Sequence, residues 1–245
     1  MISVCIATYN GEKYIYDQIH SILSQLSEVD EVIVSDDGST DNTLEIIRNI
    51  NDSRIKIYSH NKVVNPYFSN KTMYATSNFE NALSKCTGDI IFLSDQDDVW
   101  YGNKVETCMK MIENCDFVMS NYTLVNDDMS IVKEKMYDTP PFSKNLIKVV
   151  LDPHMPGCCF CFRRSILKYA LPFPSRILCH DLWIGLIAIR HFRTCYYDNP
   201  LIFHRMAPTS GLGHTSDNTF LEKIKYRLYS LLELQHIKRV HKEHK

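Results

Sequence analysis

The stretch Ile90–Trp100, IIFLSDQDDVW, decides how the rest of the sequence is interpreted. An apolar run is followed directly by three carboxylates, Asp95, Asp97 and Asp98. Like charges this close repel one another and raise one another's pKa unless a cation lies between them. The next basic residue along the chain is Lys104. The first hypothesis is therefore that a divalent metal ion, arriving with a ligand, supplies the missing positive charge.

Two structural interpretations compete with a metal site. The acidic run is also typical of a surface turn or of the first turn of a helix, where negative charge is favourable. Neither explains why a second acidic pair, Asp36-Asp37, follows another apolar run. Mg²⁺ and Mn²⁺ are commonly held by one or two carboxylates together with substrate phosphates. Because the sequence contains no glycine-rich phosphate-binding motif, we expect the metal to do most of the phosphate binding.

Composition restricts the classes of protein that need consideration. The 245 residues are 44% hydrophobic and 23% charged with a formal net charge of −2, which is typical of a globular α/β protein and gives no basic field for nucleic acid. The first residues do not resemble a signal peptide, and no apolar run is long enough to span a membrane. We expect a cytoplasmic protein, at most peripheral on the inner face of the cell membrane.

Nine cysteines raise the question of disulfides and metal clusters. Cys158 and Cys161 form a CxxC, but no second pair follows at zinc-ribbon spacing. The surrounding segment, GCCFCFRR, favours a strand rather than the helix start that a redox-active pair would need. The sequence therefore predicts buried, reduced cysteines with a structural role.

Strand and helix patterns alternate through the first hundred residues. Apolar, β-branched runs at 2–9, 31–37, 54–60 and 89–95 predict strands, and the segments between them have helical periodicity. This alternation predicts βαβ units with a mostly parallel sheet, in which ligands bind beyond the carboxyl ends of the strands. Three polar clusters occupy those ends: Thr8-Tyr9-Asn10, Asp36-Asp37 and Asp95-Gln96-Asp97-Asp98. The sequence thus predicts that all three lie at one edge of the sheet.

The second half is less regular. It predicts a hairpin at 117–132, a short helix at 145–151, a strand at 158–164, a helix at 180–192 and a strand at 199–205. No clean linker separates it from the first half. We expect one domain over 1–218, in which a second half at about 106–218 completes the site begun by a first half at about 1–105, followed by a basic helix at 219–245.

Three segments together resemble the family 2 glycosyltransferases of the GT-A fold. They are ISVCIATYN at 2–10, VIVSDDGSTDNT at 32–43 and FLSDQDDVW at 92–100. The resemblance is close over about residues 1–105 and looser beyond. It implies a Rossmann-like, mostly parallel central sheet flanked by helices, and an inverting transferase of the bacterial O-antigen or capsular polysaccharide type. It also implies a nucleotide-sugar donor, linked to UDP or dTDP, and an oligosaccharide acceptor.

The resemblance also implies roles for residues of the first half. The nucleotide would be contacted by Thr8, Tyr9, Asn10, Asp36, Asp37, Lys71 and Asp95. Asp36 or Asp37 would accept a hydrogen bond from N3–H of uracil or thymine, and Asn78 is a further candidate. Asp97 would bind Mn²⁺ or Mg²⁺, and Asp98 would lie beside the metal and the donor sugar.

An inverting transfer needs a general base for the acceptor hydroxyl. The segment HDLWIGLIAIRHF at 180–192 resembles the part of the family that supplies it, which assigns the base to Asp181. The alternative is that Asp181 only caps a helix. Trp183 is either a platform for the acceptor sugar or a core residue, and Gly157 would let the backbone approach the sugar.

The segment IFHRMAPTSGLGH at 202–214 resembles a late family segment only in part. His204 is assigned as a metal ligand, with His214 as the second candidate. Arg205 would neutralise the diphosphate. The order and spacing of these residues differ from the family pattern.

The tail offers two interpretations. Its apolar residues, Phe220, Ile224, Leu228, Leu231 and Leu232, fall near one face of a basic helix. Such a helix suits an anionic membrane surface, and hence a lipid-linked acceptor, or packs on the domain as a solvated helix. For the whole chain, a sugar nucleotidyltransferase, a receiver domain and a carbohydrate-binding module remain as alternatives. The sequence predicts no oligomeric state.

Overall fold

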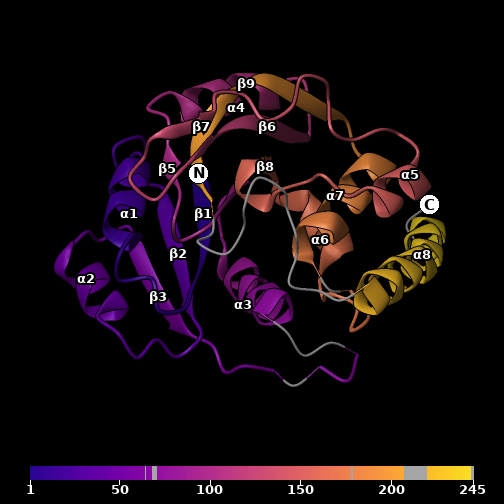
Figure 1. Ribbon diagram of the computed structural model, residues 1–245, viewed down its shortest axis with the longest axis horizontal. Coiled ribbons are helices and arrows are strands. Elements are labelled where there is room, and N and C mark those ends of the chain that lie inside the picture. The colour runs from indigo at the N-terminus through magenta and orange to yellow at the C-terminus, as the bar shows by residue number, and fades with distance from the viewer. Residues whose placement is uncertain (64, 68–70, 178, 207–219, 244–245) are drawn as a thin grey trace.

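A nine-stranded mixed sheet forms the centre of the protein, whose computed structural model is drawn in Figure 1. The structure describes residues 1–63, 65–67, 71–177, 179–206 and 220–243, without the side chains of 71, 220–223, 236 and 238–243. The strands are β1 (Ile2–Thr8), β2 (Glu31–Asp36), β3 (Ile55–Ser59), β4 (Ile90–Ser94), β5 (Val99–Trp100), β6 (Phe117–Val125), β7 (Ile131–Lys133), β8 (Phe160–Arg163) and β9 (Thr194–Arg205). Their order is β3-β2-β1-β4-β8-β6-β9-β5, and β7 also pairs with β6.

Helices flank this sheet. They are α1 (Ile15–Leu23), α2 (Thr43–Asn49), α3 (Lys71–Lys85), α4 (Lys104–Ile112), α5 (Leu146–Leu151), α6 (Leu167–Ala170), α7 (His180–His191) and α8 (Phe220–Glu243). Two short 3₁₀ turns, Gly157–Cys159 and Arg164–Ile166, lie on either side of β8. In Figure 1, α1 and α2 lie at one end of the molecule and α5 to α8 gather at the other. Within the described chain, no helix combines the length and the apolar character that crossing a bilayer requires.

The first four strands along the chain are parallel to one another, as the alternation of patterns predicts. Strands β1, β2 and β4 are almost entirely buried, because parallel sheets are covered on both faces. The register places Thr8 opposite Asp36 and Ile6 opposite Ser94. The carboxyl ends of three strands therefore meet at one edge, where the three predicted polar clusters begin.

The second half extends the sheet with mixed pairing. Strand β8 is antiparallel to both β4 and β6, whereas β9 is parallel to β6. The two-residue strand β5 is antiparallel to β9, with Val99 opposite Phe203. Because Asp98 precedes Val99 and His204 follows Phe203, this pairing brings the two side chains together.

The structure corrects three expectations. Helix α4 was not predicted, and β9 begins at Thr194, earlier than the expected residue 199. The prediction that all nine cysteines are reduced is wrong for Cys115 and Cys195, which form a disulfide with Cα atoms 6.1 Å apart. The pairing of Phe117 with Thr194 brings the starts of β6 and β9 together and so places the two cysteines side by side. The other seven cysteines are free, and six of them are buried.

The C-terminal helix packs on the domain through a face that the sequence did not single out. Helix α8 contacts α5 and α7, and its buried side chains include Ser230, Leu234 and Ile237. Ile224 and Leu228, from the predicted apolar face, are exposed instead. The side chain of Phe220, also assigned to that face, lies outside the described residues.

Glu31, at the start of β2, makes the stability of the fold depend on pH. Its buried carboxylate accepts hydrogen bonds from Ser3 Oγ at 2.6 Å, Lys56 Nζ at 2.7 Å and Thr87 N at 2.7 Å. Burial raises the pKa of Glu31, but these donors outweigh burial and lower the pKa from 4.5 to about 2. The stabilisation from Glu31 is therefore complete above pH 4.5 and is lost as the pH falls towards about 2.

We expect Glu31→Gln to lower the free energy of unfolding at pH 7 by about 1–3 kcal/mol, because a buried charged acceptor is removed. Urea unfolding of both proteins at several pH values measures the difference, which should shrink as the pH falls below 4.5. Glu45→Gln, at an exposed position of α2, is the matched control. A difference that does not change with pH would contradict this assignment.

Candidate active site

Asp36 and Asp37 have different surroundings at the end of β2. Asp36 accepts hydrogen bonds from Thr8 Oγ1 at 2.9 Å, from Gly38 N at 3.0 Å and from Ser39 N at 2.8 Å. These bonds fix the loop after β2, where Gly38 has a φ of 78°. Asp37 accepts a hydrogen bond from Nδ1 of His60 at 2.5 Å. Of the two carboxylates, Asp37 keeps the greater capacity to accept a bond from a ligand.

Gln96 joins the first and third polar clusters, and it was not among the predicted site residues. Its Oε1 accepts from Tyr9 N at 2.9 Å, and its Nε2 donates to Tyr9 O at 3.2 Å. A Cβ atom on Gly11 would lie 2.5 Å from Oε1 of Gln96, so a larger residue there would displace the Gln96 side chain. Asn10 has a φ of 49° and accepts from Thr40 N at 2.8 Å, which ties the β1 loop to the β2 loop. Nothing in the sequence indicated that the Gln96 side chain would bind the backbone of Tyr9.

The ring of Tyr9 faces outward from this loop. It is 44% exposed, and Nζ of Lys62 lies 3.7 Å from its centroid. Asn78, on α3, donates to Thr8 O at 3.2 Å, while among the described residues its buried Oδ1 has no hydrogen-bond partner. Lys71 begins α3, but its side chain lies outside the described residues. The β1 edge thus presents an exposed aromatic face and a buried amide oxygen.

The acidic run after β4 is held by β9. Asp98 is fully buried, and its Oδ1 accepts from His204 Nδ1 at 2.8 Å and more weakly from Arg205 N at 3.4 Å. Burial raises the pKa of Asp98, but His204 outweighs it, so that this pKa is lowered. Burial lowers the pKa of His204, and Asp98 then raises it to about 10. The two side chains therefore form a charged pair.

The neighbouring carboxylates are left with excess negative charge. Burial, followed by repulsion from Asp98 and Asp97, raises the pKa of Asp95 to about 8. Burial and then Asp98 raise the pKa of Asp97 to about 6. Because the pKa values of both carboxyl groups are raised, a further cation bound beside them would be stabilised.

A metal ion fits this cluster. One ligand atom from each of Asp95, Asp98, Cys158 and His204 lies within 4.8 Å of the others. The second carboxylate oxygen of Asp98 is buried and, within the described chain, has no hydrogen-bond partner. The pKa of the Cys158 thiol is raised by its hydrogen bond with Cys159 and by burial. Carboxylate oxygens with one imidazole suit Mn²⁺ or Mg²⁺. Asp97, the predicted ligand, is not one of these four.

Part of the missing positive charge comes from the protein itself. Lys104 is fully buried at the start of α4, donates to Cys158 O at 2.7 Å and helps to lower the pKa of Asp98. His204, whose pKa Asp98 raises, supplies a second positive charge when it does not bind a metal ion. The expectation that the charge arrives only with a ligand is therefore corrected, because folding brings basic residues from α4 and β9 to the acidic run.

Arg205 lies beside the same cluster. Its Nη1 donates to Asp127 O at 2.7 Å, and its guanidinium lies 4.9 Å from the centroid of the Tyr14 ring. Its charge lowers the pKa of Asp97, although burial outweighs this effect. His214, the second histidine considered from the sequence, lies outside the described residues.

Asp181 accepts two hydrogen bonds in the first turn of α7. Its Oδ2 accepts from Gly157 N at 3.0 Å, and its Oδ1 accepts from the Cys179 thiol at 3.1 Å and lies 3.2 Å from Nδ1 of His180. The N-cap of α7 is Cys179, not Asp181. Gly157, which donates to Asp181, directly precedes Cys158 of the acidic cluster, and the charge of Asp181 contributes to the raised pKa of Asp95, so Asp181 lies near that cluster. The capping alternative therefore does not describe this residue.

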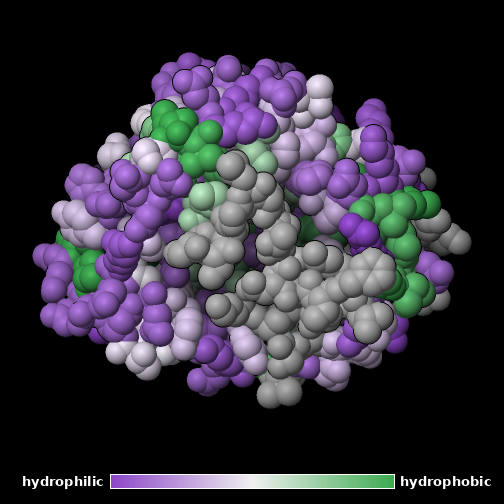
Figure 2. Space-filling view, in the orientation of Figure 1, coloured by the Kyte–Doolittle hydropathy of each residue, from purple (hydrophilic) through white to green (hydrophobic). Residues whose placement is uncertain are grey.

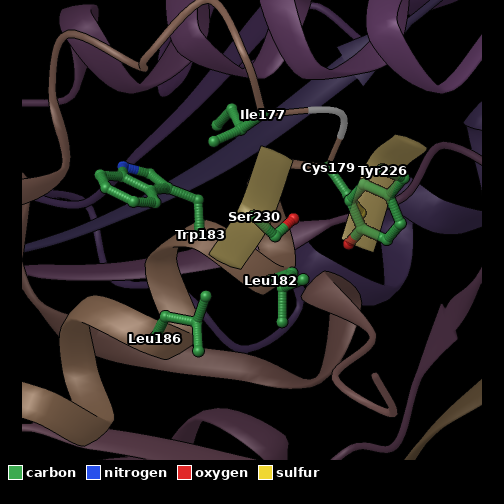
Figure 3. Close-up of a pocket in the computed structure, with 7 residues that line it drawn as sticks. All are labelled: Ile177, Cys179, Leu182, Trp183, Leu186, Tyr226 and Ser230. Carbon is green, nitrogen blue, oxygen red and sulfur yellow. The ribbon is translucent and has the colours of Figure 1, made fainter. Parts of the chain in front are cut away.

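The structure places Trp183 in the core, which corrects its assignment as a sugar platform. The side chain is 2% exposed, and its indole N–H donates to Ala170 O at 2.9 Å. Figure 3 shows it lining a small pocket together with residues of α7 and α8, among them Leu186, Tyr226 and Ser230. The core interpretation, which the sequence left open, is the one that the packing supports.

The chain belongs to glycosyl transferase family 2, whose family model matches residues 3–170. With the curled α/β sheet described above, this makes the protein a GT-A family 2 glycosyltransferase.

Two curated relatives illustrate the similarity. A UDP-Glc:alpha-D-GlcNAc-diphosphoundecaprenol beta-1,3-glucosyltransferase, WfgD of Escherichia coli, is 32% identical over 135 residues, which cover 54% of this chain and 50% of that protein. The dTDP-rhamnosyl transferase RfbG of Shigella flexneri is 36% identical over 108 residues, covering 42% and 35% respectively. The chain spans about half the length of the first curated relatives that it matches, or less.

Solved structures agree on the fold. Residues 1–349 of TarS from S. aureus, in complex with UDP-GlcNAc, have a TM-score of 0.68 at 20% identity, covering 94% of this chain and 66% of that one. The mannosyltransferase PcManGT from Pyrobaculum calidifontis, in complex with GDP-Man and Mn²⁺, has a TM-score of 0.60 at 18% identity, covering 85% and 58%.

Gly157 gives a test of the geometry around Asp181. A Cβ atom at Gly157 would lie 3.3 Å from Cγ of Asp181 and 3.3 Å from Nε2 of His180. We expect Gly157→Ala to displace Asp181 by a few tenths of an ångström and to lower the rate of glycosyl transfer about 10- to 100-fold. Steady-state transfer assays measure the effect. In the control, Gly102→Ala, the new methyl group meets no atom within 4 Å. Equal rates in the two variants would contradict the role given to Gly157.

Proposed function

We propose that the protein is a metal-dependent, inverting glycosyltransferase that moves a sugar from a UDP- or dTDP-linked donor to a hydroxyl of a glycan acceptor. The observation that carries the proposal is that two carboxylate sites lie near each other. An acidic cluster suited to a divalent cation lies near Asp181, which is held by Gly157 N without serving as the helix cap. The acidic cluster, with a cation bound, is suited to the leaving diphosphate, and Asp181 is suited to the incoming hydroxyl.

The nucleotide is assigned to the edge formed by β1 and β2. Asp37, oriented by His60, accepts from N3–H of the base, while Asp36 and Thr8 hold the loop. The exposed ring of Tyr9 offers a face for stacking. The preference for uracil or thymine follows, because cytosine has no proton at N3 to donate.

The acidic cluster is assigned to the metal. Asp95 and Asp98 are the candidate carboxylates and His204 the candidate imidazole. Asp97, the ligand assigned from the sequence, lies next to Asp98 and remains a third candidate carboxylate. When bound, Mn²⁺ or Mg²⁺ neutralises the charge that develops on the leaving diphosphate. Arg205 lies beside this site and adds a fixed positive charge.

Asp181 is assigned as the general base. It takes the proton of the acceptor hydroxyl as the hydroxyl oxygen forms a bond to C1 of the sugar. The bond from C1 to the phosphate oxygen breaks in the same step, and the diphosphate leaves with its electron pair. One displacement inverts the configuration at C1, and no covalent intermediate with the protein is required.

The wider role is inferred from relatives. Two relatives favour bacterial surface polysaccharide synthesis: WfgD and TuaG of Bacillus subtilis, whose name assigns it to teichuronic acid biosynthesis. The diphosphoundecaprenol in the name of WfgD favours a lipid-linked acceptor. We assign the donor half to about 1–105 and the acceptor half to about 106–218, followed by the helix at 219–245.

Thermal unfolding tests donor and metal together. The protein is heated with UDP, dTDP, GDP or CMP, each in Mn²⁺, Mg²⁺ or EDTA. A nucleotide at 100 times its Kd adds about 2.7 kcal/mol, which is a rise in Tm of roughly 5–10 °C at this chain length. We expect the rise with UDP or dTDP and metal only, and its loss in Asp97→Asn but not in Asp17→Asn, an exposed acidic control. No shift with any nucleotide would contradict the proposal.

Asp181→Asn separates chemistry from binding. The amide cannot accept the proton, so we expect transfer to fall about 10²- to 10⁴-fold while the nucleotide-dependent rise in Tm is kept. Transfer assays and thermal unfolding on the same samples measure both. Turnover within a factor of about three of the unaltered protein would exclude Asp181 as the base.

A further inference from the structure

Exposed apolar side chains concentrate on two adjoining helices. Eleven large hydrophobic residues are exposed in the described chain, and five of them lie on α5 and α8. These five, which we call the α5–α8 apolar face, are Ile147, Leu151, Ile224, Leu228 and Leu232, each between 42% and 56% exposed. The two helices contact each other, and hydrophobic residues gather on the α5 and α8 side of the molecule in Figure 2. Single exposed hydrophobics need no explanation, but a contiguous group marks an interaction site.

Helix α8 has a separate face for the core. Tyr226, Ser230, Leu234 and Ile237 point towards the domain, and Figure 3 shows Tyr226 and Ser230 against residues of α7. Residues four apart share one face of a helix, so Ile224, Leu228 and Leu232 form a second stripe. The stability of the domain therefore does not account for this stripe.

Positive charge borders the apolar face. Lys144 and Lys148 are exposed at and before α5, and Arg227 is exposed on α8 beside Leu228. Two carboxylates lie nearby: Asp152, 2.9 Å from His154, and Glu233, which lies near Arg176. The three basic residues outnumber them, so the border has a net positive charge.

We propose that the α5–α8 apolar face docks on an anionic lipid surface. Apolar side chains on a helix that enter the headgroup boundary, with Lys and Arg around them, are the features of interfacial membrane helices. Each basic residue near an anionic surface adds to the attraction. A second copy of this chain fits less well, because a twofold contact would bring two cationic borders face to face.

Docking through the α5–α8 apolar face would also hold the active site at the lipid surface. Helix α8 packs behind α7, where Tyr226 lines a pocket with Cys179, and the thiol of Cys179 donates to the base Asp181. A lipid-carried acceptor would then reach Asp181 from the docked side. This consequence rests on the proposed function, whereas the docking itself does not.

Vesicle sedimentation tests the docking directly. The full chain is mixed with phosphatidylcholine vesicles containing about 30% phosphatidylglycerol, or with pure phosphatidylcholine vesicles, at low and at high salt. We expect sedimentation with the anionic vesicles that weakens at high salt, because screening removes the electrostatic part. The nucleotide-dependent rise in Tm is recorded on the same sample, so that failure of docking is distinguished from failure of the proposed function.

Two variants separate the apolar and the charged contributions. Leu228→Ser with Leu232→Ser should lower the partition coefficient on anionic vesicles about tenfold or more. Lys148→Gln with Arg227→Gln should lower it about fivefold per charge, without changing the weak binding to pure phosphatidylcholine. Ile131→Ser, at an equally exposed apolar position on β7, is the matched control and should bind as the unaltered protein does.

Three outcomes would overturn the proposal. The first is sedimentation of the unaltered protein that is the same with and without anionic vesicles. The second is equal vesicle binding by the control and by the Leu228→Ser, Leu232→Ser variant, with unchanged Tm in both. The third is a dimer in analytical ultracentrifugation that this double variant dissociates, because the face would then be a contact between copies of this chain.

Discussion

The ion pair between Asp98 and His204 joins the two halves of the protein at the site. It exists because β5, two residues long, pairs with the end of β9. Removing both charges from water is costly, and removing only one would leave the other buried and unpaired. Asp97 and Arg205 adjoin the two paired residues, so their positions follow from this contact.

The acidic residues of the site divide into two kinds. Asp36 and the Oδ1 atom of Asp98 are occupied by the protein: Asp36 holds the loop after β2, and Asp98 Oδ1 holds β9. Asp95 and Asp97 lie beside Asp98 with raised pKa values, and Asp37 follows Asp36 with a side-chain hydrogen bond from His60. A buried carboxylate that organises a loop allows its neighbour to face a ligand, which explains why the acids occur in pairs.

The first half of the fold could be predicted well because its signals are local. Apolar runs of strand length, separated by helical periodicity, leave few alternatives to a parallel sheet. Parallel strands then require their carboxyl ends to share one edge, so the meeting of Thr8, Asp36 and Asp95 follows from topology. The second half could not be predicted so closely, because β8, β6 and β9 pair across long separations that sequence periodicity does not reveal.

The sequence by itself determined the fold class, the sheet edge that carries the site and the family resemblance, because these depend on patterns within short segments. Only the tertiary structure decided which residues share that site. It buried Lys104 beneath the acidic run, paired Cys115 with Cys195 and placed Trp183 in the core. It also turned Leu228 outward on α8. The physical reason is that burial and charge pairing depend on which distant segments pack together, and no local pattern encodes that choice.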